Sequence, residues 1–310
     1  MLLQAAAAAA AGQQHPGATL YLVATPIGNL ADFSLRAVHL LALADAVACE
    51  DTRVSGGLLR HLGLDKPLIA LHEHNEREAA QRVLERLARG ERVAYVSDAG
   101  TPGVSDPGAV LVALAREAGH RVVPIPGASS VVAALSVAGD AGGPGRAGGH
   151  VFVGFLPAKG PDRAAALRAL AAEARCAVVF EAPHRIEALA AALAEACGPR
   201  DMTVCRELTK QFEQVATLPA TRFPAWLAAD AQRQRGEFVL VLHALPPAEE
   251  GTGLQAAAQR SLQVLLAAHL PLKQAVALAA EISGAPRNAL YAHALAWRNE
   301  QTPADEDGEG

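Results

Sequence analysis

The chain has 310 residues, enough for about two domains of the usual size. Hydrophobic residues make up 51% of it and aromatic residues only 4%, so its cores are expected to consist mainly of Leu, Val and Ala. A net charge of -5 argues against a protein that binds nucleic acid non-specifically, because such proteins usually carry a basic excess.

The start of the chain and the cysteines indicate where the protein works. Residues 1–17 are rich in alanine and lack the basic residues of a signal peptide, so we expect a disordered tail, frayed or weakly helical. No pair of cysteines has C-x-x-C spacing, which argues against a zinc knuckle or a redox motif. Free thiols are typical of a reducing cytoplasm, and no apolar run reaches the roughly 18 residues of a membrane span. We therefore expect a cytoplasmic protein that makes no membrane contact.

Strands and helices alternate through residues 18–139, the expected N-terminal domain. The predicted strands are Thr19–Ala24, Asp45–Glu50, Leu68–Leu71, Arg92–Val96 and Arg121–Ile125. Predicted helices begin at Ser34, at Asn75, at Asp106-Pro107, where Asp is the N-cap, and at Ser129. This alternation predicts an α/β domain with a mainly parallel sheet.

Three of these strands end in turns rich in small residues and proline. The turns are Thr25–Leu30, Val96–Gly103 and Pro126–Ser130. The first contains neither G-x-G-x-x-G nor the Gly-Lys-Ser/Thr of a phosphate loop, which excludes the two commonest nucleotide motifs. Open α/β sheets bind ligands at the carboxyl ends of their strands. Exposed backbone amides and the single carboxylate of Asp98 suggest a small ligand with an amino-acid or nucleoside part.

Residues 140–149 are a glycine-rich linker, after which residues 150–245 read as a second α/β domain. Its predicted strands are Val151–Phe155, Ala177–Glu181, Met202–Arg206, Gln214–Leu218 and Glu237–His243, and its helices lie near residues 162–174, 184–197 and 221–234. Polar residues follow several of these strands, as they do in the first domain. We therefore expect a binding site in the cleft between the two domains.

The last part of the chain differs in charge from the rest. Residues 254–299 are expected to form two or three short helices that carry Arg260, Lys273, Arg287 and Arg298 against one acid, Glu281. A locally basic helical module is a plausible RNA contact, and a helical appendage that completes a core or dimer is the alternative. Residues 300–310 are an acidic tail.

Two further groups of residues have open assignments. His72 and His74 would point the same way in an extended segment, but no third convergent ligand is visible, so no metal is expected. Substrate contact is favoured over metal binding, and a structural role at the entry to the next helix is the alternative. Glu207 and Lys210 follow a strand, where they could form a structural ion pair or take part in catalysis.

Several sequence motifs occur together and in a fixed order. They are LYLVATPIGNL, ACEDTR, ALHEHNE, VAYVSDAGTPGVSDPG, VVPIPGASS, GFLPAK, RELTK and GEFVLV. The chain thereby resembles the ribosomal-RNA-modifying members of the tetrapyrrole methylase superfamily over about residues 19–298. The resemblance implies two α/β domains with S-adenosylmethionine in the cleft, a C-terminal helix-turn-helix-like module and a homodimer. It also implies 2′-O-methylation of a cytidine ribose in the decoding centre of 16S rRNA, within the small ribosomal subunit.

The same resemblance assigns residues to the methyl-donor site. They are Pro26, Gly28, Asp98, Ala99, Gly100, Thr101, Val104, Ser129 and Ser130, with Glu181 on the side of the second domain. Methyl transfer from a sulfonium donor depends mainly on orientation, and a general base can assist a weak nucleophile such as a ribose hydroxyl. The candidates for that base are Glu181, Glu207, Lys210 and His72, and the sequence does not choose among them.

Two other functions fit parts of the pattern. A tetrapyrrole methyltransferase, acting on a corrin or sirohaem precursor, would share the donor site but has less need of a basic helical C-terminus. A non-enzymatic RNA-binding protein of ribosome assembly would not need the donor turns.

Overall fold

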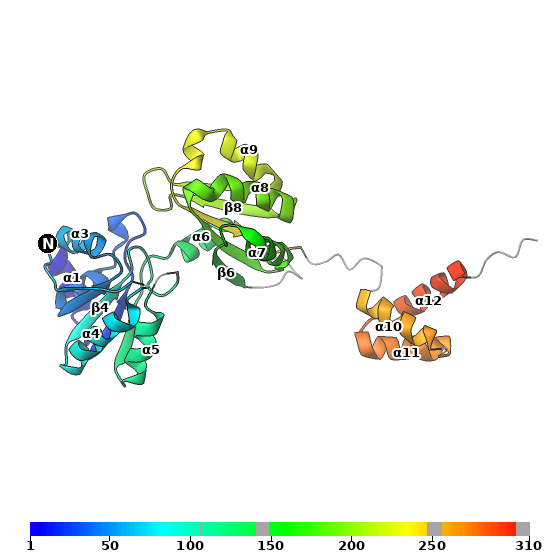
Figure 1. Cartoon of the computed structure of the whole chain (residues 1–310), viewed down its shortest axis with the longest axis horizontal. Helices are drawn as coiled ribbons and strands as arrows, with labels where there is room; N and C mark the ends of the chain where they lie inside the picture. The colour runs from blue at the N-terminus through cyan, green and yellow to red at the C-terminus, as the bar shows by residue number, and fades with distance from the viewer. Residues whose placement is uncertain (73, 106, 141–148, 247–255, 269, 302–310) are drawn as a thin grey trace, which may run out of the picture. The chain divides into compact units, whose positions relative to one another are not determined.

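The computed structural model describes residues 1–72, 74–105, 107–140, 149–246, 256–268 and 270–301 (Figure 1). The chain divides into two compact units, Met1–Leu245 and Pro246–Gly310. The glycine-rich segment predicted as a linker falls almost wholly outside the described residues, as does most of the acidic tail.

The first sheet has five strands in the order β3-β2-β4-β1-β5 and is parallel throughout, as the sequence predicts. Its strands are β1 (Thr19–Val23), β2 (Ala46–Cys49), β3 (Leu68–Ala70), β4 (Arg92–Val96) and β5 (Arg121–Ile125). Because all five run the same way, the turns after β1, β4 and β5 lie at one edge of the sheet. This shared edge is what brings the three small-residue turns together.

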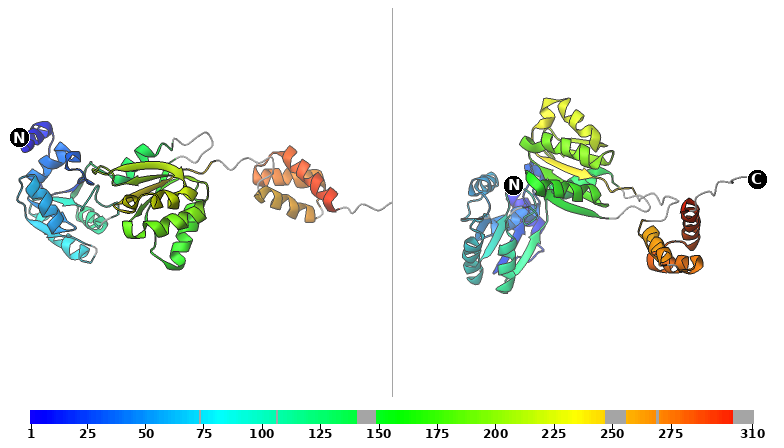
Figure 2. Two further views of the ribbon diagram at one scale, coloured as in Figure 1. Left: turned by 90° about the horizontal axis from the view of Figure 1, so that it is seen from above. Right: turned by 45° about the vertical axis from the view of Figure 1, so that its right-hand side comes forward.

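Helices cover both faces of this sheet (Figure 1 and Figure 2). One core packs helices α2 (Leu35–Leu43) and α3 (Thr52–His61) against the strands, and the other packs α4 (Glu76–Ala88) and α5 (Ala109–Glu117). A further helix, α6 (Ser130–Ala138), follows β5 and packs against the second sheet. The strand interiors are mainly small and aliphatic, as the low aromatic content predicts, but Tyr21 of β1 and Tyr95 of β4 are also fully buried.

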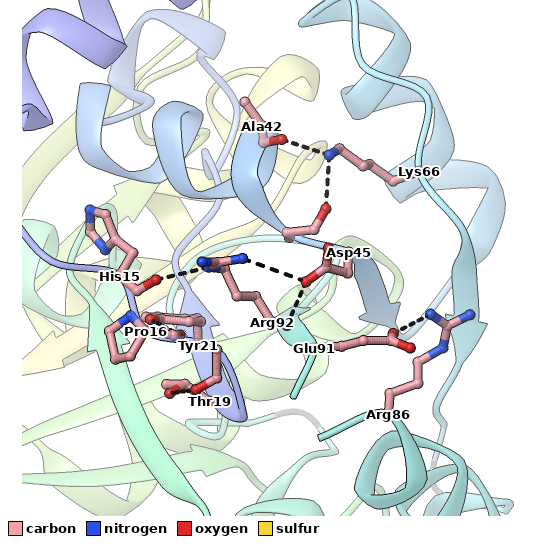
Figure 3. Close-up of polar contacts among 12 residues, drawn as sticks. His15, Pro16, Thr19, Tyr21, Ala42, Asp45, Lys66, Arg86, Glu91 and Arg92 are labelled. Atoms are coloured by element: carbon pink, nitrogen blue, oxygen red, sulfur yellow. Dashed lines mark hydrogen bonds and ion pairs between the residues drawn. The ribbon is translucent and has the colours of Figure 1, made fainter. Parts of the chain in front are cut away.

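Residues 1–17 are more ordered than the disordered, frayed or weakly helical tail that the sequence predicts. Residues Leu2–Ala10 form helix α1, in which Ala6 and Ala10 are buried and Ala6 belongs to the same core as α2. The segment that follows is tied to the sheet, because Tyr21 donates a hydrogen bond to the Pro16 carbonyl and Arg92 donates one to the His15 carbonyl (Figure 3). Alanine favours helix, and contact with α2 supplies the burial that so short a helix needs.

Helix α5 begins in a way that local sequence does not reveal. Its N-cap residue, Gly108, has no capping side chain, and Asp106, the predicted cap, lies outside the described residues. The carboxylate of Glu76, in the first turn of α4, instead accepts hydrogen bonds from the backbone N–H groups of Gly108 (2.7 Å) and Val110 (3.0 Å). One acidic residue therefore joins two helices and satisfies two of the free amides at the start of α5.

We expect Glu76→Ala to lower the free energy of unfolding by about 1–2 kcal/mol, as the loss of a helix cap does. Urea unfolding of the variant measures this change. Glu78→Ala is the matched control, because Glu78 is exposed on the same turn. Equal stability of the two variants would show that the Glu76 carboxylate does not cap α5.

The second sheet also has five strands, in the order β6-β7-β10-β8-β9, and only the β6–β7 pair is parallel. Its strands are β6 (His150–Phe155), β7 (Cys176–Glu181), β8 (Asp201–Arg206), β9 (Gln214–Pro219) and β10 (Phe238–Leu242). Helices α7 (Gly160–Ala172) and α8 (Ile186–Cys197) pack with it. The single helix predicted over residues 221–234 is instead broken into a short helix, α9 (Phe223–Ala228), flanked by 3-10 turns, because Asp230 caps a new turn by accepting the Gln232 N–H.

The second unit contains three described helices, α10 (Ala256–Ala267), α11 (Leu272–Ser283) and α12 (Arg287–Gln301). Pro271 and Pro286 stand directly before α11 and α12, as predicted. The three helices share one small core of Ala, Leu and Val side chains. Arg260, Lys273 and Arg287 are exposed, so they are available to a ligand of this unit.

All four cysteines are free thiols. Burial raises the pKa of Cys176 to about 11 and that of Cys205 to about 12, so both stay protonated and unreactive at neutral pH. Among the described residues, no helix combines the length and apolar character that crossing a membrane requires.

Candidate functional site

A cavity of about 540 Å³ lies where the carboxyl-end turns of the first sheet meet the second sheet. Its volume suits a small-molecule site. The lining residues from the first half of the chain come from the turns and from the start of α6, and those from the second half come from the ends of β6, β7, β8 and β10. The cleft expected from the sequence is therefore present within the first unit.

Hydrogen bonds join the three small-residue turns to one another. Thr25 and Gly100 exchange backbone hydrogen bonds of 2.9 and 3.1 Å, which link the turns after β1 and β4. The Thr101 hydroxyl donates to the Ala128 carbonyl at 3.0 Å, which links the turn after β4 to the one after β5. The wall that these turns form is thus held in place before any ligand binds, which lowers the entropy cost of binding.

Asp98 supplies the carboxylate of this wall. Its Oδ1 accepts the backbone N–H of Asp51 at 3.1 Å, which fixes the side chain at the end of β4. Burial raises the pKa of Asp98, so the protein holds a partly desolvated carboxylate beside the cavity. Such a group is well suited to accept hydrogen bonds from ligand hydroxyl or ammonium groups.

Glu207 and Lys210 form an ion pair that also includes Glu237. Lys210 Nζ lies 2.8 Å from Glu207 Oε1 and 3.0 Å from Glu237 Oε2, and Glu207 Oε1 also accepts the Glu237 N–H. Burial alone would raise the pKa of Glu207, but the bonds from Lys210 and the Glu237 N–H outweigh it and lower the pKa. Burial alone would lower the pKa of Lys210, but its bonds to the Glu207 and Glu237 carboxylates outweigh burial and raise the pKa. Both groups are therefore charged and engaged with each other, which favours a structural role over proton abstraction.

The Lys210 side chain also explains the glycine of the first turn. A Cβ on Gly28 would lie 2.5 Å from Lys210 Cγ, so only glycine lets the lysine stem cross this turn. Because Lys210 follows β8 and Gly28 follows β1, this contact joins the two halves of the unit beside the cavity. Gly28 thus fits a packing role more directly than a ligand contact.

Glu181, at the end of β7, is buried, with its side chain wholly shielded from solvent. Its Oε1 lies 3.1 Å from Arg185 Nε and accepts the Ala182 N–H at 3.0 Å. Arg185 is itself anchored by a hydrogen bond to the Leu156 carbonyl. Glu181 Oε2 has no hydrogen-bond partner among the described residues, which is unusual for a buried carboxylate oxygen. The arrangement fixes one oxygen and leaves the other, although buried, without a hydrogen-bond partner in the described part of the chain.

The structure brings most of the predicted donor residues to the cavity. Its lining includes Asp98, Ala99, Gly100, Thr101, Val104, Ser129 and Ser130, together with Glu181. Pro26 and Gly28 are not among the lining residues, although Ile27 between them is. Glu207 and Lys210 are not in the lining either, and His72 is exposed elsewhere, with its N–H donating to the Asn75 side chain.

Sequence reasoning missed the wall that the second sheet contributes. Phe155, Phe180 and the segment Glu237–Val239 line the cavity, yet none was assigned a role. The motifs GFLPAK and GEFVLV contain Phe155 and Glu237–Val239 and were the available signal. No group of three or more His, Cys, Asp or Glu residues in the described part of the chain is placed to hold a metal ion.

Comparison with known proteins places this arrangement in a family. Residues 19–224 match the model of the Tetrapyrrole (Corrin/Porphyrin) Methylases, and residues 252–298 match that of the RsmI C-terminal HTH domain. A protein of Pseudomonas aeruginosa called ribosomal RNA small subunit methyltransferase I is 47% identical over 278 residues, covering 89% of this chain and 96% of the relative. The chain belongs to this methyltransferase family. The relative of the same name from Escherichia coli O157:H7 is 46% identical over 280 residues, with 89% of this chain and 94% of the relative covered.

Solved structures of tetrapyrrole methylases share the fold of the methyltransferase family. A cobalt precorrin-4 methyltransferase has a TM-score of 0.54 at 18% identity, covering 72% of this chain and 94% of that one. Uroporphyrin-III C-methyltransferase from Thermus thermophilus, in a complex with S-adenyl homocysteine, has a TM-score of 0.50 at 20% identity. The match covers 72% of this chain and 96% of that one. These likenesses confirm the two-sheet architecture predicted from the sequence.

Proposed function

We propose that this chain transfers the methyl group of S-adenosylmethionine to the 2′-hydroxyl of a cytidine in 16S rRNA. The strongest support is that the chain matches the rRNA methyltransferase family over nearly its whole length and also contains a preformed cavity of the size of a small molecule. The ribosome as substrate also implies work in the cytoplasm. For this function we propose an N-terminal α/β domain at residues 18–139, a second α/β domain at residues 150–245 and a helical module at residues 254–299.

The cavity residues fit the methyl donor. Asp98 offers a fixed carboxylate to the hydroxyl or ammonium groups of the donor, and Ala99, Gly100, Thr101 and Ser129 form a wall of small side chains around it. The donor brings a methyl group already activated by a positively charged sulfur. The protein therefore has to hold the ribose hydroxyl in line with that methyl group. Correct orientation of the two reacting groups by itself accelerates methyl transfer strongly.

Among the four candidates for the base, we propose Glu181. It lines the cavity and has an unpartnered buried oxygen, whereas Glu207 and Lys210 are engaged with each other and His72 lies outside the cavity lining. In this role Glu181 Oε2 accepts the proton of the 2′-hydroxyl as the methyl group is transferred. Arg185 positions the carboxylate by holding Oε1.

We propose that the basic helical module binds the ribosomal RNA. Replacing exposed Arg260, Lys273 and Arg287 together with alanine is expected to raise the KM for small subunits and to make it less sensitive to salt, because fewer phosphates are contacted. Methylation kinetics at several salt concentrations measure both effects. Donor affinity, measured by calorimetry, is expected to stay unchanged, and an unchanged KM would contradict the proposed RNA contact.

The family resemblance also leads us to propose a homodimer, which sedimentation equilibrium of the purified protein tests directly. The substrate itself is tested by supplying labelled S-adenosylmethionine with small subunits, free rRNA or a tetrapyrrole precursor in parallel reactions. We expect label in the RNA of at least one ribosomal substrate and none in the tetrapyrrole. Label in the tetrapyrrole alone would instead establish the function of the wider superfamily.

A further inference from the structure

Strand β6 contains an irregularity that changes where its last aromatic side chain points. Its register against β7 shifts between Phe152 and Gly154, and Gly154 has a φ of +73°, which other residues rarely adopt. In a regular strand, side chains alternate between faces, so residues 152 and 155 would lie on opposite sides. Here both rings instead contact Phe180, with centroids 5.0 and 5.6 Å from it.

The bulge therefore aims Phe155 at the cavity. A regular strand would direct this ring to the other face of the sheet, which packs with α8 in the core of the second domain. Phe155 instead lines the cavity while remaining 55% exposed. Bulges beside active sites commonly redirect one side chain in this way. A large aromatic ring held in solvent at a binding site calls for a ligand that covers it.

We propose that Phe155 is the surface on which the base of the target nucleotide stacks, an inference that rests on the proposed function. The base is bonded to C1′, the neighbour of the carbon that carries the 2′-hydroxyl. A nucleotide that places this hydroxyl near Glu181 therefore has its base within reach of Phe155, since both residues line one cavity. Enzymes that modify a single nucleotide generally take it out of its helical stack, and an aromatic ring replaces the lost stacking.

The contacts of the ring suit this role. Phe155 meets Phe180 in a T-shaped arrangement with an interplanar angle of 69°, which orients the Phe155 ring without a parallel stack. Because Phe155 is 55% exposed, part of its ring surface is left for a base. The wall formed by the turns after β4 and β5 carries Asp98 and small residues that suit the donor. The donor is therefore assigned to that wall, and the nucleotide base to the wall that contains Phe155.

The test compares four full-length variants by steady-state methylation of small subunits. Phe155→Ala and Phe155→Leu remove the aromatic face, Phe155→Tyr retains it, and Phe212→Ala is the matched control. Phe212 is 67% exposed in the same domain and is not among the cavity-lining residues. We expect the Ala and Leu variants to raise the KM for subunits about 5- to 100-fold, as loss of a stacking aromatic does, while the Tyr and Phe212 variants stay close to wild type.

Two further measurements identify what the ring contacts. Calorimetry is expected to give the same affinity for S-adenosylmethionine in all four variants, and sedimentation the same oligomeric state. Loss of donor affinity in Phe155→Leu would assign the ring to the donor, and a changed oligomeric state would assign it to an interface between copies. Either result overturns the stacking proposal, as does an unchanged KM. Wild-type protein that methylates no RNA overturns the proposed function as well, so the two failures are distinguishable.

Discussion

Glu181→Gln is expected to slow methyl transfer by roughly 10²-fold or more at saturating donor and RNA, because a general base contributes about 10²- to 10⁴-fold. The substitution preserves the size of the side chain and one acceptor oxygen but removes the negative charge. Arg185 can still meet the amide oxygen, so the fold around β7 and Leu156 should persist. Single-turnover methylation rates measure the effect on the chemical step alone.

Two comparisons make this result specific. Glu187→Gln, which alters an exposed glutamate in the first turn of α8, is the control and should leave the rate unchanged. His72→Ala should act mainly on the KM for RNA, because His72 is exposed and lies outside the cavity lining. A larger rate defect in His72→Ala than in Glu181→Gln would refute the assignment of the base. Lost donor affinity with an unchanged rate at saturation would make Glu181 a donor ligand.

Asp98→Asn and Asp98→Ala are expected to weaken S-adenosylmethionine binding at least tenfold, since a hydrogen bond to a charged group contributes about 1.5–3 kcal/mol. Asp98 is the carboxylate of the preformed wall, and its Oδ1 is already held by the Asp51 N–H. Calorimetric titration with the donor measures the loss. Asp32→Asn, an exposed aspartate of the same domain, is the control, and equal affinities would remove Asp98 from the site.

The same residue predicts how donor binding responds to acid. Asp98 must be ionised to accept hydrogen bonds with both oxygens, and burial raises its pKa. Acidification should therefore weaken donor binding at a higher pH than an ordinary aspartate would, as Asp98 becomes protonated. In Asp98→Asn this pH dependence should disappear, and its persistence would assign it to another group.

The sequence was sufficient for the parts of the structure that depend on local pattern. The strands of both sheets, the cap at Ser34 and the helix starts after Pro271 and Pro286 were predicted within a few residues. Alternating strands and helices also implied a parallel first sheet, which in turn placed the turns after β1, β4 and β5 at one edge. The cavity wall that we propose for the donor consists of these turns.

What the sequence could not predict depends on contacts between distant residues. Glu76 caps a helix that begins more than 30 residues later, and Glu237, directly before β10, joins the ion pair of Glu207 and Lys210. The direction of Phe155 depends on a bulge in the pairing of β6 with β7, which one strand alone does not encode. Of these tertiary contacts, the one between Glu207, Lys210 and Glu237 bears on the choice of base, because it engages the Glu207 carboxylate and supports the proposal of Glu181.

The position of the transferred methyl group tests the central claim most directly. Small subunits methylated with labelled S-adenosylmethionine are extracted, and their RNA is hydrolysed with alkali, which cleaves next to every free 2′-hydroxyl. We predict that the label appears in one alkali-resistant dinucleotide whose 5′ residue is 2′-O-methylcytidine. Label on a base, or RNA without label under conditions in which the protein binds the donor, would contradict the account.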